Sequence, residues 1–351
     1  MARHSRVFRT GLRSDRANMR ARTPTYLLSL AIFSLTSGGA SLAAESPDVS
    51  QILDTAAILT ADSDTAYVSD YFSFASLPGP DEIAFALDTN RGRKGDAYQA
   101  EHFVELYEAP RGWIDIPGYA KFENTGKVLT ELPDSPFFSF DGQSYGPVTI
   151  SAKDVPLRLE VGAIEPRFTR HDDRVLFSLG SAPATLEWQG RAVRGRVIYE
   201  YLVMRGSNRL AGLSISGILD ALGHGPDFQG LYLATGDGQD LYIQLSESSA
   251  ASALMDPLLA FETRADAAAA IRNLTFEILD YDLAFGFYRW PVRWQASWDA
   301  SCGQATLQVG SQAHKTEKNW LIGGFAMQAL SGTLSCEGRA VPVFGFGEVI
   351  R

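Results

Sequence analysis

The chain has 351 residues, 45% of them hydrophobic and 21% charged, with 31 Lys and Arg against 41 Asp and Glu. The net charge of −10 argues against a nucleic-acid-binding protein, which needs a basic face, and the large apolar fraction excludes a globally disordered chain. Two cysteines are too few for a disulfide-stapled miniprotein or a zinc ribbon.

The first 43 residues have the composition of a secretory signal peptide. They hold seven arginines and one acid, Asp15, and include an eleven-residue apolar run at 26–36. That run is shorter than the roughly 20 residues that span a bilayer as a helix, and small residues follow it. We therefore expect cleavage after Ala43 and a periplasmic or secreted bacterial protein without a transmembrane segment, translated from Met1 or Met19. The mature 308 residues then carry 24 basic and 40 acidic residues, a net charge of −16.

Nearly all of the mature chain has the pattern of β-strands. Short stretches that alternate apolar and polar residues, or are continuously apolar, are separated by Gly, Pro, Asp or Asn, which is typical of antiparallel sandwiches and barrels. In the first half the predicted strands are 70–77, 82–88, 101–107, 112–116, 147–151, 157–161, 174–179, 184–188 and 196–203. In the second half they are 210–216, 230–234, 240–245, 274–279, 293–298, 305–309, 332–336 and 341–346.

The predicted organisation is two similar β-domains after the signal peptide at 1–43. The break at 205–208 is the best boundary, giving an N-terminal domain at 44–205 and a C-terminal domain at 206–351, each about the size of a small β-barrel. Residues 256–272 are the one stretch with helical composition. We therefore expect an all-β protein, barrel or sandwich, with one short helical insertion.

Two local features in the C-terminal half carry structural predictions. Residues 236–240 contain an Asp-Gly pair, which predicts a hairpin with a type I′ turn rather than a calcium loop. Cys302 and Cys336 are the only cysteines, and an exported protein meets an oxidising compartment. We expect them to form a disulfide that joins two strands of the C-terminal part.

Two constellations are candidates for acid–base chemistry. Asp220 and His224 stand close together at a predicted strand end and could move protons near neutral pH; the alternative is a polar turn. Glu200 lies between Tyr199 and Tyr201, so it faces away from both. If Glu200 points into a barrel lumen, burial would raise its pKa and make it a candidate acid; otherwise it points outward between two core tyrosines. The histidines have no metal-ligand spacing, so we expect neither a metal nor another cofactor.

Aromatic residues are frequent in the predicted strands, and an aromatic-lined barrel can hold one apolar ligand. The candidate ligand-binding residues are Tyr71, Phe74, Phe85, Tyr199, Tyr201, Tyr232, Trp290 and Trp294.

Several short motifs stand in the order found in one known family. They include Gly230-Leu-Tyr-Leu followed by an Asp-Gly hairpin, Trp290-Pro-Val-Arg-Trp294, and the terminal Gly345-Phe-Gly-Glu-Val349. In these elements the chain resembles the lipocalin-like superfamily of bacterial carotenoid 1,2-hydratases (hydroxyneurosporene synthases) and attachment-type predicted secreted hydrolases. The resemblance implies two packed lipocalin-like domains and a cavity for a lipid or isoprenoid.

For function, the resemblance and the strand pattern together favour an exported protein that binds an apolar small molecule, a lipid or isoprenoid, as a carrier or a non-hydrolytic enzyme. The first alternative is a hydratase or cyclase that acts on an isoprenoid and uses Asp220 or His224 as proton donor. The family has a histidine at the position that Ala221 occupies in this chain. Because that residue is missing, ligand binding is favoured over hydratase or cyclase activity. The second alternative is a structural envelope protein without a ligand. The oligomeric state is left open.

Overall fold

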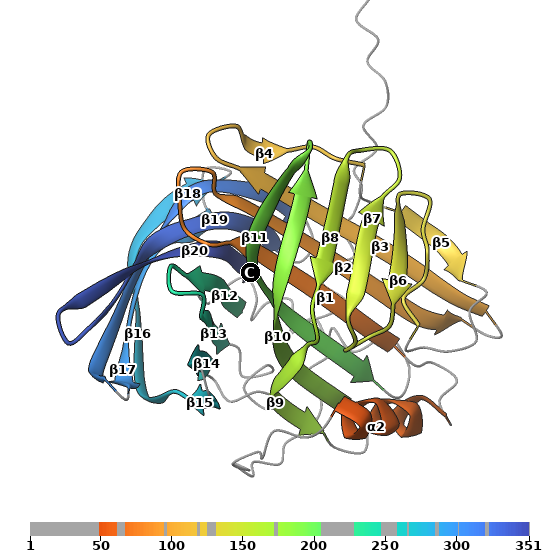
Figure 1. The fold of residues 1–351 in the computed structure, drawn as a ribbon, viewed down its shortest axis with the longest axis horizontal. Helices are drawn as coiled ribbons and strands as arrows, with labels where there is room; N and C mark the ends of the chain where they lie inside the picture. The colour runs from red at the N-terminus through yellow and green to blue at the C-terminus, as the bar shows by residue number, and fades with distance from the viewer. Residues whose placement is uncertain are drawn as a thin grey trace, which may run out of the picture.

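The computed structural model describes residues 49–61, 67–94, 97–117, 120–124, 131–171, 175–204, 228–246, 258–264, 267–284, 288–300, 302–319 and 323–350 (Figure 1). The predicted signal peptide, the predicted boundary at 205–208, the predicted strand at 210–216, and Asp220 and His224 lie outside these residues. In the described part of the chain, no helix is long and apolar enough to cross a membrane.

Eleven strands from the first half form one antiparallel sheet. They are β1 (Tyr67–Ser76), β2 (Ile83–Lys94), β3 (Ala97–Glu108), β4 (Gly112–Ile114), β5 (Ala120–Asn124), β6 (Phe138–Gly142), β7 (Val148–Ala152), β8 (Leu157–Val161), β9 (Glu165–His171), β10 (Val175–Trp188) and β11 (Arg191–Met204). The strand order is β4-β3-β2-β1-β11-β10-β8-β7-β6, with β5 beside β3 and β9 beside β10. The first and last strands, β1 and β11, therefore pair at its centre.

Nine strands from the second half form the other sheet. They are β12 (Phe228–Thr235), β13 (Asp240–Ser246), β14 (Leu258–Arg264), β15 (Ala267–Ala270), β16 (Arg272–Ala284), β17 (Tyr288–Ala300), β18 (Gly303–Asn319), β19 (Gly323–Cys336) and β20 (Arg339–Ile350). Their order is β15-β14-β13-β12-β20-β19-β18-β17-β16, so again the first and last strands, β12 and β20, pair with each other. Both sheets are curled (Figure 1), and the predicted all-β, two-part lipocalin-like architecture is confirmed.

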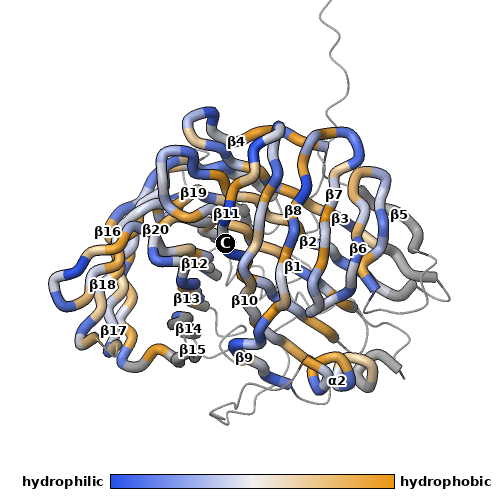
Figure 2. The backbone as a smooth tube through the Cα atoms, viewed as in Figure 1, coloured by the Kyte–Doolittle hydropathy of each residue, from blue (hydrophilic) through white to orange (hydrophobic). Residues whose placement is uncertain are grey.

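Alternate residues of the central strands face different cores, as period-two strand geometry requires. In β1, Val68, Phe72 and Phe74 pack in a core on the inner side of the first sheet. The residues between them face the other way, and Tyr71 and Ala75 pack in a core that both sheets share. Hydrophobic and hydrophilic residues follow one another along the strands of both sheets (Figure 2).

The second sheet divides its residues in the same way. In β12, Leu231 and Leu233 pack in the inner core of the second sheet, whereas Tyr232 and Ala234 pack in the shared core. The alternation of residues along the central strands thus gives three hydrophobic cores: one inside each sheet and one between the sheets. The core between them holds the two sheets against each other.

The helix is not where the sequence pattern placed it. Residues 258–264 and 267–270, inside the predicted helical stretch, are the strands β14 and β15. The four alanines of β15 have high helix propensity, but pairing with β14 outweighs that preference. The helix is instead α2 (Val49–Ala61), whose Ile52 and Ala56, four residues apart on one face, are buried against the first sheet.

The hairpin predicted at 236–240 is confirmed, but its turn type is not. It joins β12 to β13, and Gly238 donates its backbone N–H to the Thr235 carbonyl (2.9 Å). Gly238 has a φ of 83° while Asp237 has no positive φ. A type I′ turn needs positive φ at two successive residues, so the loop is of another type.

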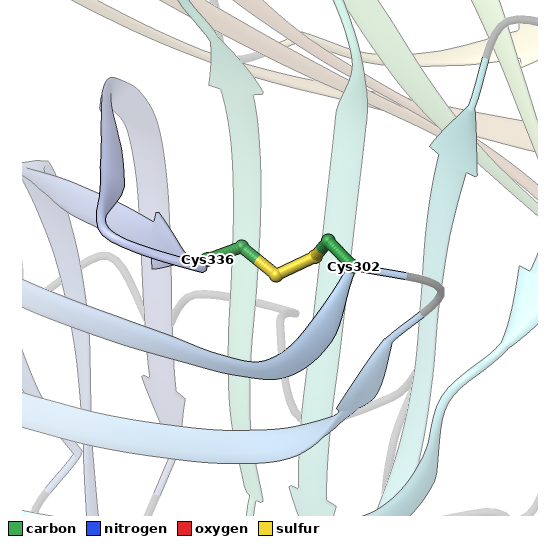
Figure 3. Close-up of a disulfide and its surroundings, with 2 residues drawn as sticks. All are labelled: Cys302 and Cys336. Carbon is green, nitrogen blue, oxygen red and sulfur yellow. A yellow bond between two sulfur atoms is a disulfide. The ribbon is translucent and has the colours of Figure 1, made fainter.

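The predicted disulfide between Cys302 and Cys336 is confirmed (Figure 3). Cys302 lies in the turn between β17 and β18, and Cys336 is the last residue of β19. Their Cα atoms are 6.0 Å apart. The bond therefore links the start of β18 to the end of β19, its neighbour within the second sheet.

Candidate functional site

The candidate site lies where the two sheets meet. The central strands of the first sheet, β1 and β11, pack against β12, β13 and β20 of the second, and the shared core there is rich in aromatic rings. Its members include Tyr71, Tyr107, Tyr232, Tyr242, Phe344 and Phe346. Several carboxylates lie among these rings, and their environment is unlike that of surface acids.

Glu200 is the central carboxylate of this site. It lies on β11, directly opposite Tyr71 of β1. It accepts hydrogen bonds from the hydroxyls of Tyr232 (2.8 Å) and Tyr242 (2.9 Å), both on the second sheet. Burial raises the pKa of Glu200 to about 7, although the two phenol donors act in the opposite direction. A carboxyl with this pKa can donate and accept a proton near neutral pH.

Glu348 brings a second carboxylate to the same place from β20. Its Oε2 lies 3.4 Å from the Tyr232 hydroxyl, so that hydroxyl stands between carboxylates of the two sheets. Burial raises the pKa of Glu348 well above its ordinary value, and the negative charge of the nearby Glu200 raises it further. Two carboxylates this close favour holding a proton between them, because ionising both places like charges in an apolar interface.

Asp88 and Tyr71 complete the polar part of the site on the first sheet. Asp88 is buried on β2 and accepts hydrogen bonds from Ser69 (2.9 Å) and Asn90 (2.8 Å). Burial raises the pKa of Asp88 to about 6 in spite of these donors. Burial also raises the pKa of Tyr71, and Glu348 and Glu200 add to the effect, so its phenol is neutral. The site therefore combines three carboxyls with neutral phenols.

Two ion pairs hold the sheets in register around the site. Arg196 of β11 makes a bidentate contact with the buried Asp240 of β13, with Nε 2.9 Å from Oδ1 and Nη2 2.5 Å from Oδ2. Lys315 of β18 lies 2.9 Å from Glu105 of β3. Bidentate arginine pairs fix orientation as well as distance, so the site's two halves are positioned by charged contacts outside it.

Glu200 takes the second of the two orientations drawn from the sequence, pointing outward from the first sheet's inner core between two core tyrosines. Tyr199 and Tyr201 face the inner core of the first sheet, where Tyr199 donates to Asp70. Glu200 faces away from that core and toward the second sheet, which covers most of it. Its pKa is nevertheless raised, because the carboxyl is buried between the two sheets and not in a barrel lumen.

The other predicted residues are divided among the three cores. Tyr71 and Tyr232 lie together in the site, their rings 5.5 Å apart and edge-to-face. Phe74 and Phe85 are fully buried in the first sheet's core, and Trp290 and Trp294 in the second sheet's core. Their proposed role in ligand binding stays a prediction.

Sequence reasoning missed Glu348, Tyr242 and Asp88 as members of the site. The sequence does contain a local indication for Glu348. In β20 it lies on the same face of the strand as Phe344 and Phe346, which pack in the shared core. What the pattern could not supply was the pairing of β20 with β12 and their packing on β11.

A separate pocket of about 340 Å³ lies over β16, β17 and β18. Its lining includes Asp280, Asp282 and His314, and His314 lies 3.8 Å from Asp282. The two aspartate side chains are 58% and 57% exposed, so water screens their charge. Among the described residues, no group of three His, Cys, Asp or Glu could hold a metal ion. We therefore place the candidate site at the interface.

No protein-family model matches the sequence, and no curated protein matches it either. Solved structures share its fold, among them two to which this chain is similar along most of its length. A candidate AttH protein from Nitrosomonas europaea is 11% identical, with a TM-score of 0.55, over 89% of this chain and 99% of that one. Kievitone hydratase from Nectria haematococca is 8% identical, with a TM-score of 0.50, over 90% and 96%. The fold implied by the sequence resemblance is thus confirmed.

Proposed function

We propose that the protein is an enzyme that protonates an unsaturated, apolar small molecule and adds water to it, with Glu200 as the acid. The observation that carries the proposal is the meeting of Glu200 and Glu348, from opposite sheets, around one phenol hydroxyl in an aromatic interface. A structural interface has no need of two carboxyl groups in its apolar part, since hydrophobic residues of similar size stabilise such contacts at least as well.

The reaction follows from what the site's groups can do. The Glu200 carboxyl gives its proton to one alkene carbon, and the π electrons form the new C–H bond, which leaves a carbocation at the other carbon. A water oxygen then forms the C–O bond with that carbon, and its spare proton passes to the Glu200 carboxylate. The acid is regenerated and the net change is the addition of one water molecule.

The aromatic rings supply the environment that this step needs. The rings of Tyr71 and Tyr232 lie beside Glu200, and the negative face of an aromatic ring stabilises a neighbouring cation. Burial among these rings favours the protonated form of Glu200 near neutral pH. The name of kievitone hydratase agrees with this chemistry, but the likeness to it is one of fold.

The test is conversion of candidate alkenes in water labelled with heavy oxygen, followed by mass spectrometry. We expect isoprenoid or aryl alkenes to gain one labelled water with the wild-type protein. Glu200→Gln should lose at least about 100-fold of that rate, because a general acid contributes this much. The matched control is Glu187→Gln, an exposed residue of β10 in the same sheet. Full activity of Glu200→Gln would remove the assignment.

A carrier of an apolar molecule is the second candidate. It is favoured by Trp290, Trp294 and Trp298, which are all fully buried inside the second sheet and offer a large aromatic surface. The same experiment separates the two functions. A carrier would bind the alkenes and return them unchanged, and Glu200→Gln would not alter its behaviour.

We also propose that the protein acts after export. The confirmed disulfide supports this, because such bonds persist in oxidising compartments. N-terminal sequencing of the protein from its source cells should find a chain that begins at Ala44. A chain that keeps residues 1–43 would contradict the proposal.

A further inference from the structure

Three buried hydrogen-bond donors on the first sheet face the shared core without a partner. They are the Tyr71 hydroxyl and the Ser73 hydroxyl on β1, and the indole N–H of Trp113 on β4. Each polar atom is buried, and none has a hydrogen-bond partner among the residues that the structure describes. Buried polar groups are nearly always paired, so three orphans on one face of one interface require an explanation.

The donors border the same aromatic cluster as the acid pair. Tyr71 is opposite Glu200 in the sheet, and its ring meets that of Tyr232 at 5.5 Å. Tyr232 is in turn opposite Phe346, which stacks on Trp113 with ring centroids 6.0 Å apart. Tyr71 and Trp113 are thus connected through two touching residues of the second sheet.

All three unpaired groups can donate a hydrogen bond, although the two hydroxyls can also accept one. An indole N–H can only donate a hydrogen bond, and the raised pKa keeps the Tyr71 phenol protonated as a donor. Among the described groups here, the carboxylates Glu200 and Glu348 are already engaged by Tyr232. A ligand that enters this interface therefore meets the Trp113 N–H, which only an acceptor can satisfy, beside hydroxyls that an accepting oxygen can also pair.

We propose that the ligand of the interface site is an apolar molecule that carries carbonyl, ether or other accepting oxygens, with Tyr71 and Trp113 as their donors, rather than a pure hydrocarbon. The inference rests on the proposed function, because it places the ligand at the same site. This narrows the expected class of ligand: an unmodified isoprenoid hydrocarbon leaves the Tyr71 hydroxyl and the Trp113 N–H unpaired, whereas an oxygenated isoprenoid or aryl ketone brings an oxygen that accepts from such a donor. Sites built to bond a ligand's polar group discriminate strongly against analogues that lack it.

Two pairs of probes test this, each pair sharing a carbon skeleton or ring set and differing in one carbonyl. They are farnesal against farnesene, and chalcone against stilbene, with affinities measured by isothermal titration calorimetry. We expect the carbonyl member of a pair to bind at least about tenfold more tightly, the effect of one hydrogen bond to an otherwise unpaired donor. Tyr71→Phe and Trp113→Phe, which keep an aromatic ring, should each bring the affinity ratio closer to one.

The matched control is Tyr145→Phe, which removes a hydroxyl already paired with Ser178 inside the first sheet. It should leave the ratio unchanged, and the thermal midpoint of every variant reports whether it is folded. Equal affinity for both members of each pair would overturn the inference and leave the proposed function standing. Failure of all four probes to bind would count against the proposed function itself, and the inference with it.

Discussion

At the residue scale, the behaviour of Glu200 is set by what contacts its carboxylate. Its partners are two neutral phenols, Tyr232 and Tyr242. Hydrogen bonds from phenols favour the ionised form, but burial favours the neutral form more strongly, and the pKa is about 7. The side chain therefore remains an acid at a pH where an exposed glutamate is fully ionised.

This raised pKa predicts a pH dependence of stability. An unfolded glutamate titrates near 4.5 and the folded Glu200 near 7, so the folded state binds the proton more tightly between these values. The free energy of unfolding should therefore fall as the pH rises through this window, by up to about 3 kcal/mol from this group. Urea titrations at pH 5 and pH 8 measure the fall.

Glu200→Gln removes that titration, and we expect its unfolding free energy to change less between the two pH values than that of the wild type. Glu187→Gln, on the exposed face of β10, is the control and should behave as the wild type does. An identical pH dependence in all three proteins would show that Glu200 titrates normally.

At the element scale, the strands could be predicted because period-two alternation is a local signal. The predicted strand at 157–161 is β8, with Leu157, Leu159 and Val161 buried and the residues between them exposed. The alanines of β15 were misassigned because their neighbour β14, and not their own propensity, decides their conformation. The burial of Glu200 could not be predicted from its own strand. The face of β11 that carries Glu200 is covered by strands of the second sheet, which are far away in the sequence.

The disulfide carries a prediction at this scale. It closes a loop of 34 residues in sequence separation that contains most of β18 and β19. Replacing both Cys302 and Cys336 by serine should lower the free energy of unfolding by roughly 3–4 kcal/mol, because the unfolded chain regains the entropy of that loop. Urea unfolding of the double variant, compared with the oxidised wild type, measures it. Equal stability of oxidised and reduced wild type would contradict the prediction.

At the scale of the whole molecule, the two sheets are held together by a shared core and by the Arg196–Asp240 and Lys315–Glu105 pairs. We therefore expect one cooperative thermal transition, with equal calorimetric and van't Hoff enthalpies. Two separate transitions would show that the sheets unfold independently, and the interface would then be too weak to hold a preorganised site.

The site itself exists only at this largest scale. Glu200, Tyr232 and Glu348 come from three strands that are distant in sequence. From the sequence alone, Glu200 is a candidate acid, and Glu348 lies in the terminal motif at 345–349. No local pattern in the sequence indicates that these two residues meet. In each half of the chain the first strand pairs with the last, β1 with β11 and β12 with β20, and these pairings bring the residues of the site together.

The central claim is that the interface holds a protonated carboxyl at neutral pH, and its most direct test is a carbon-13 titration of that carboxyl. Glutamate labelled at the side-chain carboxyl gives one resonance per residue, and the spectrum of Glu200→Gln identifies the one that belongs to Glu200. We predict that its chemical shift changes with a midpoint at about pH 7. A midpoint near the ordinary value of 4.5 would contradict the account.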